Sequence, residues 1–261
     1  MSAALAGLIA GAASGLIAGA ASKIINARRL ARRRARRAHA IRQFGPYGGK
    51  VIERAWDLAR TKAPARGRAV LRPEHLAWAL LETQPFAVAI EALGGSPAAV
   101  ETRIVDRLRA PSEPVDMAIV HARALTTAVS HKREVACADM WLALARTSAA
   151  ELVDMPPLDA HALSFWLAHG RREPALVASG EQLAVVLRND DYTTMEFVTA
   201  VLREAFGLPV ERATELMRAV HERGSAVIAR YPAAEAVERA QRARELARGE
   251  GFPLWVTVEP A

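Results

Sequence analysis

The chain has 261 residues, of which 51% are hydrophobic and 24% charged, and its formal net charge at pH 7 is +7. This length allows more than one domain. The excess charge sits in residues 1–52, which contain basic side chains and no acid, whereas the rest of the chain has slightly more acidic than basic residues. Nucleic-acid-binding proteins more often carry a basic stripe with stacking aromatics on a folded face, so this distribution argues against nucleic acid as a partner.

Residues 1–26 form an apolar segment. It carries no charge from Ser2 to Ser22, and its length suffices for a membrane-spanning helix, which needs about 20 residues. Glycine recurs at every fourth position from Gly7 to Gly19, which would give a helix a smooth stripe for close packing against another helix, a glycine zipper. The segment has few large apolar side chains, so a helix on the membrane surface or against a protein partner is the alternative.

Residues 27–47 form a basic segment directly after the apolar one. Positive charge on the C-terminal flank of a span favours the cytoplasmic side, and a secretory signal would carry its charge before the apolar stretch. The sequence therefore predicts a helix that tethers cytoplasmic domains to the inner face of the cell membrane. The basic segment can also attract an anionic membrane surface.

Residues 48–172 show helical periodicity with short loops. The stretches 73–81 and 138–145 have a similar apolar pattern, which indicates two copies of one helical unit. Cys137, the only cysteine of the chain, directly precedes the second stretch, within an apolar run where a buried side chain is expected. One cysteine and scattered histidines predict no metal site, and no sequence motif indicates a cofactor. Around Pro73-Glu74-His75-Leu76-Ala77-Trp78-Ala79-Leu80-Leu81 the region resembles the N-terminal domain of Clp-type ATPases, which consists of two helical repeats.

A polar linker is predicted over residues 173–181, and a second domain over 182–261. Thr193 and Glu196 have the spacing of a capping box, which predicts a helix from there to Phe206, ended by Gly207. The predicted order of elements is strand, helix, helix, strand, helix, strand, with strands over 183–187, 226–229 and 254–258. The fold class is α+β overall: an all-α repeat domain followed by a three-stranded antiparallel sheet with three helices.

The polar and apolar residues of this domain suggest a site for a group that is both cationic and apolar. A buried ammonium group needs hydrogen-bond acceptors, which Asn189, Asp191 and a neutral His221 can supply. Met195 and Val198 are neighbours on one helix, and Met217 and Val220 on the next, so with Leu254 they can line an apolar pocket. As an alternative, Asp190 and Asp191 could simply complement the start of a helix.

Three blocks of the domain resemble the ClpS adaptor family: Val-Leu-Arg-Asn-Asp-Asp-Tyr-Thr-Thr-Met-Glu-Phe-Val, Ala-Thr-Glu-Leu-Met-Arg-Ala-Val-His-Glu-Arg-Gly, and Phe-Pro-Leu-Trp-Val-Thr-Val-Glu. The resemblance implies an α-amino-binding set and a hydrophobic pocket with Thr193 at its rim. The first set is Asn189, Asp190, Asp191 and His221; the second is Thr193, Met195, Val198, Met217, Val220 and Leu254. Three positions, Thr194, Ala234 and Trp255, depart from the family pattern.

The resemblance implies a non-enzymatic adaptor. Its cargo would be proteins whose first residue is Leu, Phe, Tyr or Trp, which are destabilising N-termini or N-degrons, and it would deliver them to a Clp-family AAA+ ATPase of the ClpA or ClpC type with its peptidase. The repeat domain could also contact the adaptor domain within the chain. The alternative function is a membrane-associated scaffold or decoy that sequesters degrons or competes with the ATPase N-terminal domain. A hydrolase is disfavoured because no nucleophile lies in a recognisable motif.

Overall fold

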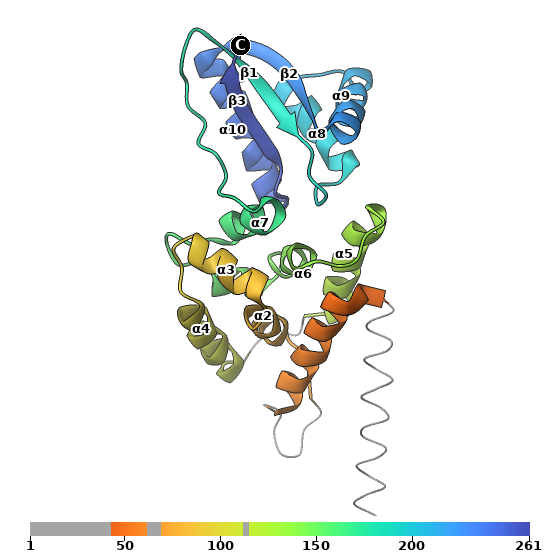
Figure 1. The fold of residues 1–261 in the computed structure, drawn as a ribbon, viewed down its shortest axis with the longest axis vertical. Coiled ribbons are helices and arrows are strands. Elements are labelled where there is room, and N and C mark those ends of the chain that lie inside the picture. Colours follow the sequence, from red (N-terminus) through yellow and green to blue (C-terminus); the bar gives the residue numbers. More distant parts are fainter. Residues whose placement is uncertain (1–42, 62–68, 112–114) are drawn as a thin grey trace, which may run out of the picture.

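The computed structural model describes residues 43–61, 69–111 and 115–261. A helical region is followed along the chain by an α+β region that contains the C-terminus (Figure 1). The predicted membrane-spanning segment 1–26 and most of the basic segment lie outside the described residues, so the membrane tether stays a prediction. Within the described ranges, no helix combines the length and the apolar character that crossing a bilayer requires.

The helical region consists of short helices around one apolar core. The helices α4 and α7 were not identified from the sequence. In α4 only Val100 and Ile104 are buried, and α7 is apolar over most of its length, so it lacks an alternation of apolar and polar positions that would mark one face. The elements, after a helical stretch over residues 43–61, are α2 Pro73–Leu81, α3 Gln84–Ala92, α4 Pro97–Arg109, α5 Met117–Ser130, α6 Cys137–Leu144, the 3-10 helix η1 Ser148–Leu152 and α7 Ala160–His169.

The helices α2 and α6, which carry the similar sequence stretches, begin in the same way. In each, the side chain of the third residue accepts a hydrogen bond from the backbone N–H of the residue before the helix: His75 at 3.1 Å and Asp139 at 2.7 Å. When the helices are aligned on this bond, Trp141 corresponds to Ala77 and not to Trp78. This similarity supports two related units, whereas the resemblance to the Clp ATPase N-terminal domain stays a prediction.

Trp141 lies at the centre of the helical core. Its side chain is fully buried, and its indole meets the ring of Phe86 edge-on at a centroid distance of 5.3 Å. The indole N–H donates to Ser164 Oγ on α7 at 3.1 Å, so the one polar atom of this side chain keeps a partner. Trp141 therefore connects α6 with α3 and α7.

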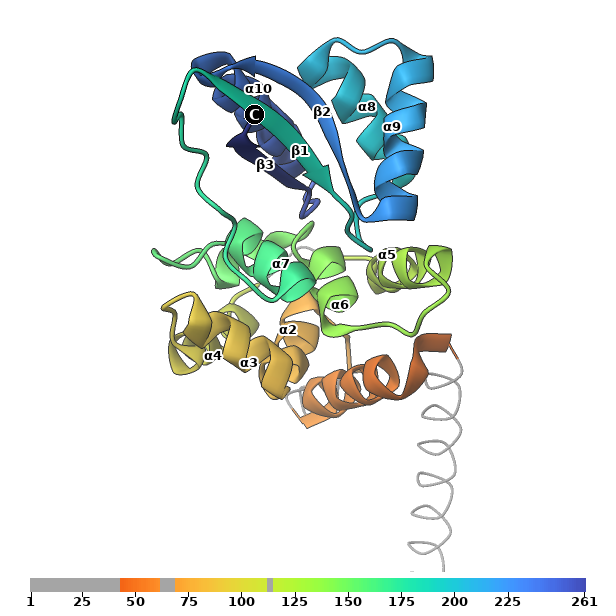
Figure 2. The same ribbon diagram turned by 45° about the horizontal axis from the view of Figure 1, so that its top comes forward.

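The α+β region has the predicted order of elements and the predicted three-stranded antiparallel sheet. The central strand is β1, whose residues from Leu183 to Leu187 are all buried, as expected for a strand paired on both edges. Figure 2 shows α10 along one face of the sheet, with α8 and α9 beside β2. The elements are β1 Gln182–Arg188, α8 Met195–Phe206, α9 Val210–Arg223, β2 Ser225–Pro232, α10 Ala233–Gly249 and β3 Trp255–Pro260.

The predicted start of α8 is wrong by one residue. The cap is Thr194, whose backbone is extended and whose Oγ accepts from the N–H of Phe197 at 3.3 Å. Thr193 is buried in the preceding loop, and its own N–H is held by Asp190 at 2.6 Å. Thr193 therefore belongs to the loop, where its N–H bonds to Asp190. Thr194, one of the departures from the family pattern, is the N-cap of the helix. The predicted end is confirmed, since Gly207 has a φ of 67°.

The helical and α+β regions touch through α7 and the chain just before β3. The ring of His169 contacts that of Trp255 in a tilted arrangement, with the centroids 4.8 Å apart, and its Nε2 lies 2.7 Å from the carbonyl oxygen of Pro253. Arg146 bonds to the carbonyl oxygen of Glu250 and lies over the ring of Phe252, 4.6 Å from its centroid. Trp255, the third departure from the family pattern, therefore packs against the helical region.

The first residue of the predicted linker, Glu173, is held by ion pairs. Its carboxylate lies 3.2 Å from Nε of Arg244 on α10 and 3.5 Å from Nε2 of His161 on α7. The neighbouring positive charges lower the pKa of Glu173 although burial opposes this. A carboxylate paired on both sides fixes the start of the linker to both regions. The exact domain boundaries stay predictions.

Stability is expected to fall as the pH drops below about 6.5. Burial lowers the pKa values of His75, His121 and His169 from 6.5, so the unfolded chain binds protons at a pH where the folded chain does not. The thermal unfolding midpoint, measured from pH 7.5 to pH 5.5, should therefore decrease. Asp190 acts in the opposite sense, because burial raises its pKa.

A variant separates these contributions. His121→Leu removes one buried imidazole that packs edge-on against Phe44 at 5.5 Å, and it leaves Asp190 in place. The decrease in the midpoint on acidification should be smaller in this variant than in the wild type. An equal decrease in both proteins would show that His121 does not take part.

Candidate functional site

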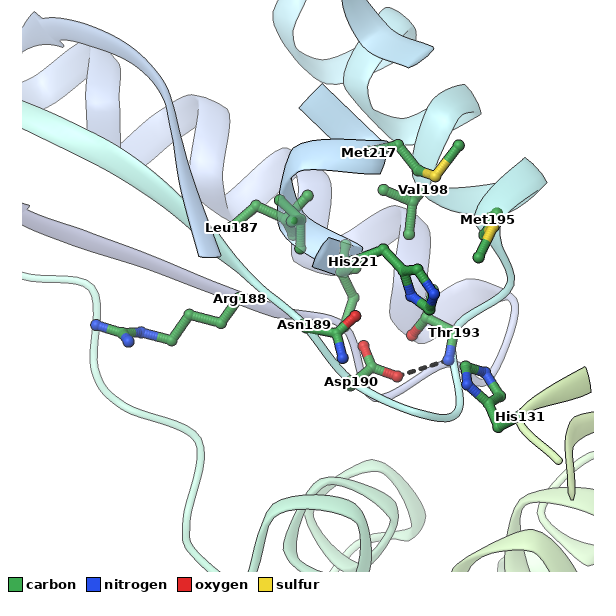
Figure 3. A pocket seen from close by; sticks show the side chains of 12 residues that line it. His131, Leu187, Arg188, Asn189, Asp190, Thr193, Met195, Val198, Met217 and His221 are labelled. Carbon is green, nitrogen blue, oxygen red and sulfur yellow. Dashed lines mark hydrogen bonds between the residues drawn. The ribbon is translucent and has the colours of Figure 1, made fainter. Parts of the chain in front are cut away.

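A pocket lies where β1, α8 and α9 converge with the chain just before β3 (Figure 3). The structure brings nine of the ten predicted site residues to its wall; Asp191 is the exception. Three lining residues were not predicted, namely His131, Leu187 and Arg188. The nine are Asn189, Asp190, Thr193, Met195, Val198, Met217, Val220, His221 and Leu254.

Backbone hydrogen bonds shape the polar side of the pocket. The N–H of Asn189 donates to the carbonyl oxygen of Gly224 at 2.8 Å, which ties the end of β1 to the end of α9. Oδ1 of Asp190 accepts from the N–H groups of Tyr192 and Thr193 at 2.8 and 2.6 Å. Asp190 therefore closes the loop on itself, in the manner of an Asx-turn. Its carboxylate has a structural task that the sequence analysis did not assign.

The apolar side of the pocket is formed by α8, α9 and Leu254. Leu254 and Val220 are buried at the base, and Val198 and Met217 are half-buried. Met195 is 41% exposed and lies at the mouth, one helical turn before Val198. The spacing of three or four residues places the side chains of each helix on one face, which is why helical periodicity, together with the resemblance to the ClpS family, identified them.

The open space between these side chains is small. Its volume is about 20 Å³, which is enough for about one water molecule. A leucine or phenylalanine side chain needs more room than this. Met195 and Met217 are unbranched and flexible, so their side chains can change rotamer and widen the pocket.

Asp191 does not line the pocket but lies beside His131 of the helical region. Its carboxylate is 56% exposed, and its Oδ1 lies 3.8 Å from Nδ1 of His131. Its carbonyl oxygen accepts from a guanidinium nitrogen of Arg133 at 3.2 Å. Figure 3 shows that His131 and His221 approach the loop from different sides, and their ring centroids are 6.4 Å apart. The polar rim of the site is thus shared between the two regions.

The three lining residues that were not predicted differ in whether the sequence could have indicated them. Leu187 and Arg188 directly precede Asn189, and the end of a buried strand could have suggested them. His131 lies 58 residues before Asn189, at the end of α5, and reaches the pocket only through tertiary packing. No local pattern in the sequence connects it with the site.

The pocket combines hydrogen-bond acceptors at its rim with an apolar base. Asn189 and His221 can accept from a positively charged donor, and Met217, Val220 and Leu254 can receive an apolar side chain. Such a site suits a ligand in which an ammonium group and an apolar group sit on one carbon atom. The fold and the site together define an α+β domain with a small pocket of mixed polar and apolar lining, joined to a helical region.

Comparison with known proteins assigns the domain to a family. The family described as "ATP-dependent Clp protease adaptor protein ClpS" matches residues 178–257. The ClpS of Desulfatibacillum aliphaticivorans is 45% identical over 76 residues, which are 29% of this chain and 73% of that protein. The ClpS of an Enterobacter strain is 47% identical over 77 residues, or 30% of this chain and 73% of that protein.

A solved structure, Agrobacterium tumefaciens ClpS2 bound to L-phenylalaninamide, is 37% identical in sequence. It covers 32% of this chain and 100% of its own, with a TM-score of 0.31. On the evidence of the family match and the two relatives, the chain belongs to the ClpS family of Clp protease adaptors through its C-terminal domain. The remaining two thirds of the chain lie outside these matches.

Proposed function

We propose that the pocket binds the free N-terminus of substrate proteins whose first residue is Leu, Phe, Tyr or Trp. The observation that carries the proposal is the convergence of Asn189, His221 and the predicted apolar residues on one pocket from three separate stretches of chain, with Asp191 next to His131 of its lining. The α-ammonium group would be held by Asn189, Asp191 and His221. The first side chain would enter between Met195, Met217 and Leu254, after both methionines have moved.

The energetics favour this ligand over an internal peptide segment. An ammonium group that leaves water needs charged or strong acceptors, and the carboxylate of Asp191 is the only charged one among its proposed partners. An apolar side chain of leucine size contributes about 1.5–3 kcal/mol when it is fully buried. An internal segment can supply the side chain but not the charge.

A series of short peptides that differ only in the first residue tests the proposal. Titration of the full chain should show binding of peptides that begin with Leu, Phe, Tyr or Trp, and much weaker binding of those that begin with Gly or Glu. Acetylation of the Leu peptide removes the charge and should abolish binding. Equal binding of the acetylated and free peptides would refute an N-terminus-binding site.

We further propose that the adaptor delivers its cargo to a Clp ATPase of the ClpA or ClpC type with its peptidase. Membership of the adaptor family supports this step. Degradation of a Leu-initiated reporter by a reconstituted ATPase and peptidase should become faster when the full chain is added. Slower degradation would support the decoy function instead, in which the chain holds degrons without releasing them to the ATPase.

A further inference from the structure

We propose that the turn after α5, residues 131–133, is a cap on the N-degron pocket, so that the helical region and a substrate N-terminus compete for the rim around Asp191. The inference rests on the proposed function of the pocket and adds a regulation of it. The cap belongs to this chain's helical region, which lies outside the part that matches the ClpS relatives.

His131 occupies the mouth of the pocket. It ends α5, its side chain is only 16% exposed, and it is one of the residues that line the cavity. Its Nδ1 lies 3.8 Å from the carboxylate of Asp191, the group that the α-ammonium of a substrate needs. A substrate N-terminus would have to take the place that the imidazole now holds beside this carboxylate.

Arg133 fixes the cap to the loop. One guanidinium nitrogen donates to the carbonyl oxygen of Asp191 at 3.2 Å, and the guanidinium carbon lies 4.7 Å from the centre of the Tyr192 ring. The same guanidinium group bonds to both carboxylate oxygens of Asp139, at 2.5 and 2.9 Å. Because Asp139 is buried at the start of α6, Arg133 is itself held rigidly, and the contact cannot shift without moving the turn.

The state of the pocket agrees with a closed cap. Asp191 does not line the cavity but faces His131, and the open volume of about 20 Å³ is too small for a degron side chain. Capture of a substrate therefore requires that Asp191 turns back toward the pocket and that the 131–133 turn moves away. Part of the binding free energy is spent on this opening, which weakens the apparent affinity.

The contacts described above between the helical region and the α+β domain lie toward one end of that domain. Arg146 of the helical region bonds to the carbonyl oxygen of Glu250, just after α10, whereas Ala234 is at the opposite end of this 17-residue helix. At 1.5 Å per residue the two ends are about 24 Å apart. The intramolecular contact therefore governs entry into the pocket, while Ala234 at the other end stays exposed among the residues that the structure describes.

The test compares His131→Ala with a matched control in the full chain. Removing the imidazole leaves the Arg133–Asp139 pair intact, so the helical region should fold normally. A fluorescent Leu-initiated peptide is expected to bind about tenfold more tightly to His131→Ala than to the wild type. Ser130→Ala changes the exposed last residue of α5, directly before the turn, which does not line the pocket. The affinity of this variant should equal that of the wild type.

The outcomes separate the cap from the proposed function. If the wild type binds the Leu peptide and His131→Ala binds equally or more weakly, the cap is refuted and the N-degron site stands. If neither protein binds the peptide, the proposed function fails. Hydrogen exchange on the wild type gives a second readout: saturating peptide should speed exchange of the backbone amides from 131 to 136, and unchanged or slower exchange would contradict displacement of the turn.

Discussion

Replacement of Asp191 by alanine is expected to weaken binding of a Leu-initiated peptide strongly. The variant loses the charged acceptor of the α-ammonium group, and truncating one partner of such a pair typically costs about 2–5 kcal/mol. This corresponds to a loss of affinity of roughly 30-fold or more. The change also removes the group that faces His131, so it loosens the cap, but an open pocket without its charged acceptor should still bind weakly.

Glu222→Ala is the matched control for this variant. Glu222 is an exposed carboxylate next to His221, and it is not among the residues that line the pocket. Its removal lowers the local negative charge by the same amount without changing the proposed acceptors. Calorimetric titration should give wild-type affinity for Glu222→Ala. An affinity of Asp191→Ala equal to that of the wild type would exclude Asp191 from the site.

Replacement of Trp141 by alanine is expected to cause the largest loss of stability among the substitutions considered. The side chain is fully buried, packs on Phe86 and donates to Ser164, so the variant loses buried apolar surface and one hydrogen bond and leaves a cavity. The Ser164 hydroxyl keeps its own bond to the carbonyl oxygen of Ala160. Such truncations cost about 3–5 kcal/mol. The unfolding transition of the helical region, followed by calorimetry, should move down by roughly 6–20 °C.

Trp78→Ala is the control of the same chemical type. Trp78 lies on α2 and is partly exposed, so its truncation removes less buried surface and should shift the transition much less. The two tryptophans look alike in the sequence because each follows a similar apolar pattern. Equal destabilisation by both substitutions would contradict the one-residue offset between α2 and α6.

The sequence predicted the α+β domain closely because local signals there agree with one another. The apolar run of β1, the helical spacing on α8 and α9, and the glycines at 207 and 224 each determine a local conformation without distant contacts. The start of α8 was misplaced because two threonines were available as caps. Only the hydrogen bond from Thr193 to Asp190 decides between them, and that bond depends on the loop.

The candidate site was predictable only where its residues lie on regular elements of one domain. Val198, Met217 and Val220 follow from helical periodicity, and Asn189 follows from the end of a strand. The contribution of His131 and the direction of the Asp191 carboxylate depend on how two regions pack, which no spacing in the sequence encodes. Trp255 stood out as a departure from the family pattern, yet its partner His169 was not foreseeable.

The short stretch from Pro253 to Trp255 has a mechanical consequence. The carbonyl of Pro253 and the ring of Trp255 are both held by His169 of α7, while Leu254 between them forms the base of the pocket. A force that displaces the helical region would therefore pull on the backbone on both sides of Leu254. The helical region therefore contacts the pocket at its base, through His169, as well as at its mouth, through His131. If the α+β domain were fused to a different helical region, the shape of the pocket would change although none of the lining residues within the domain had been replaced.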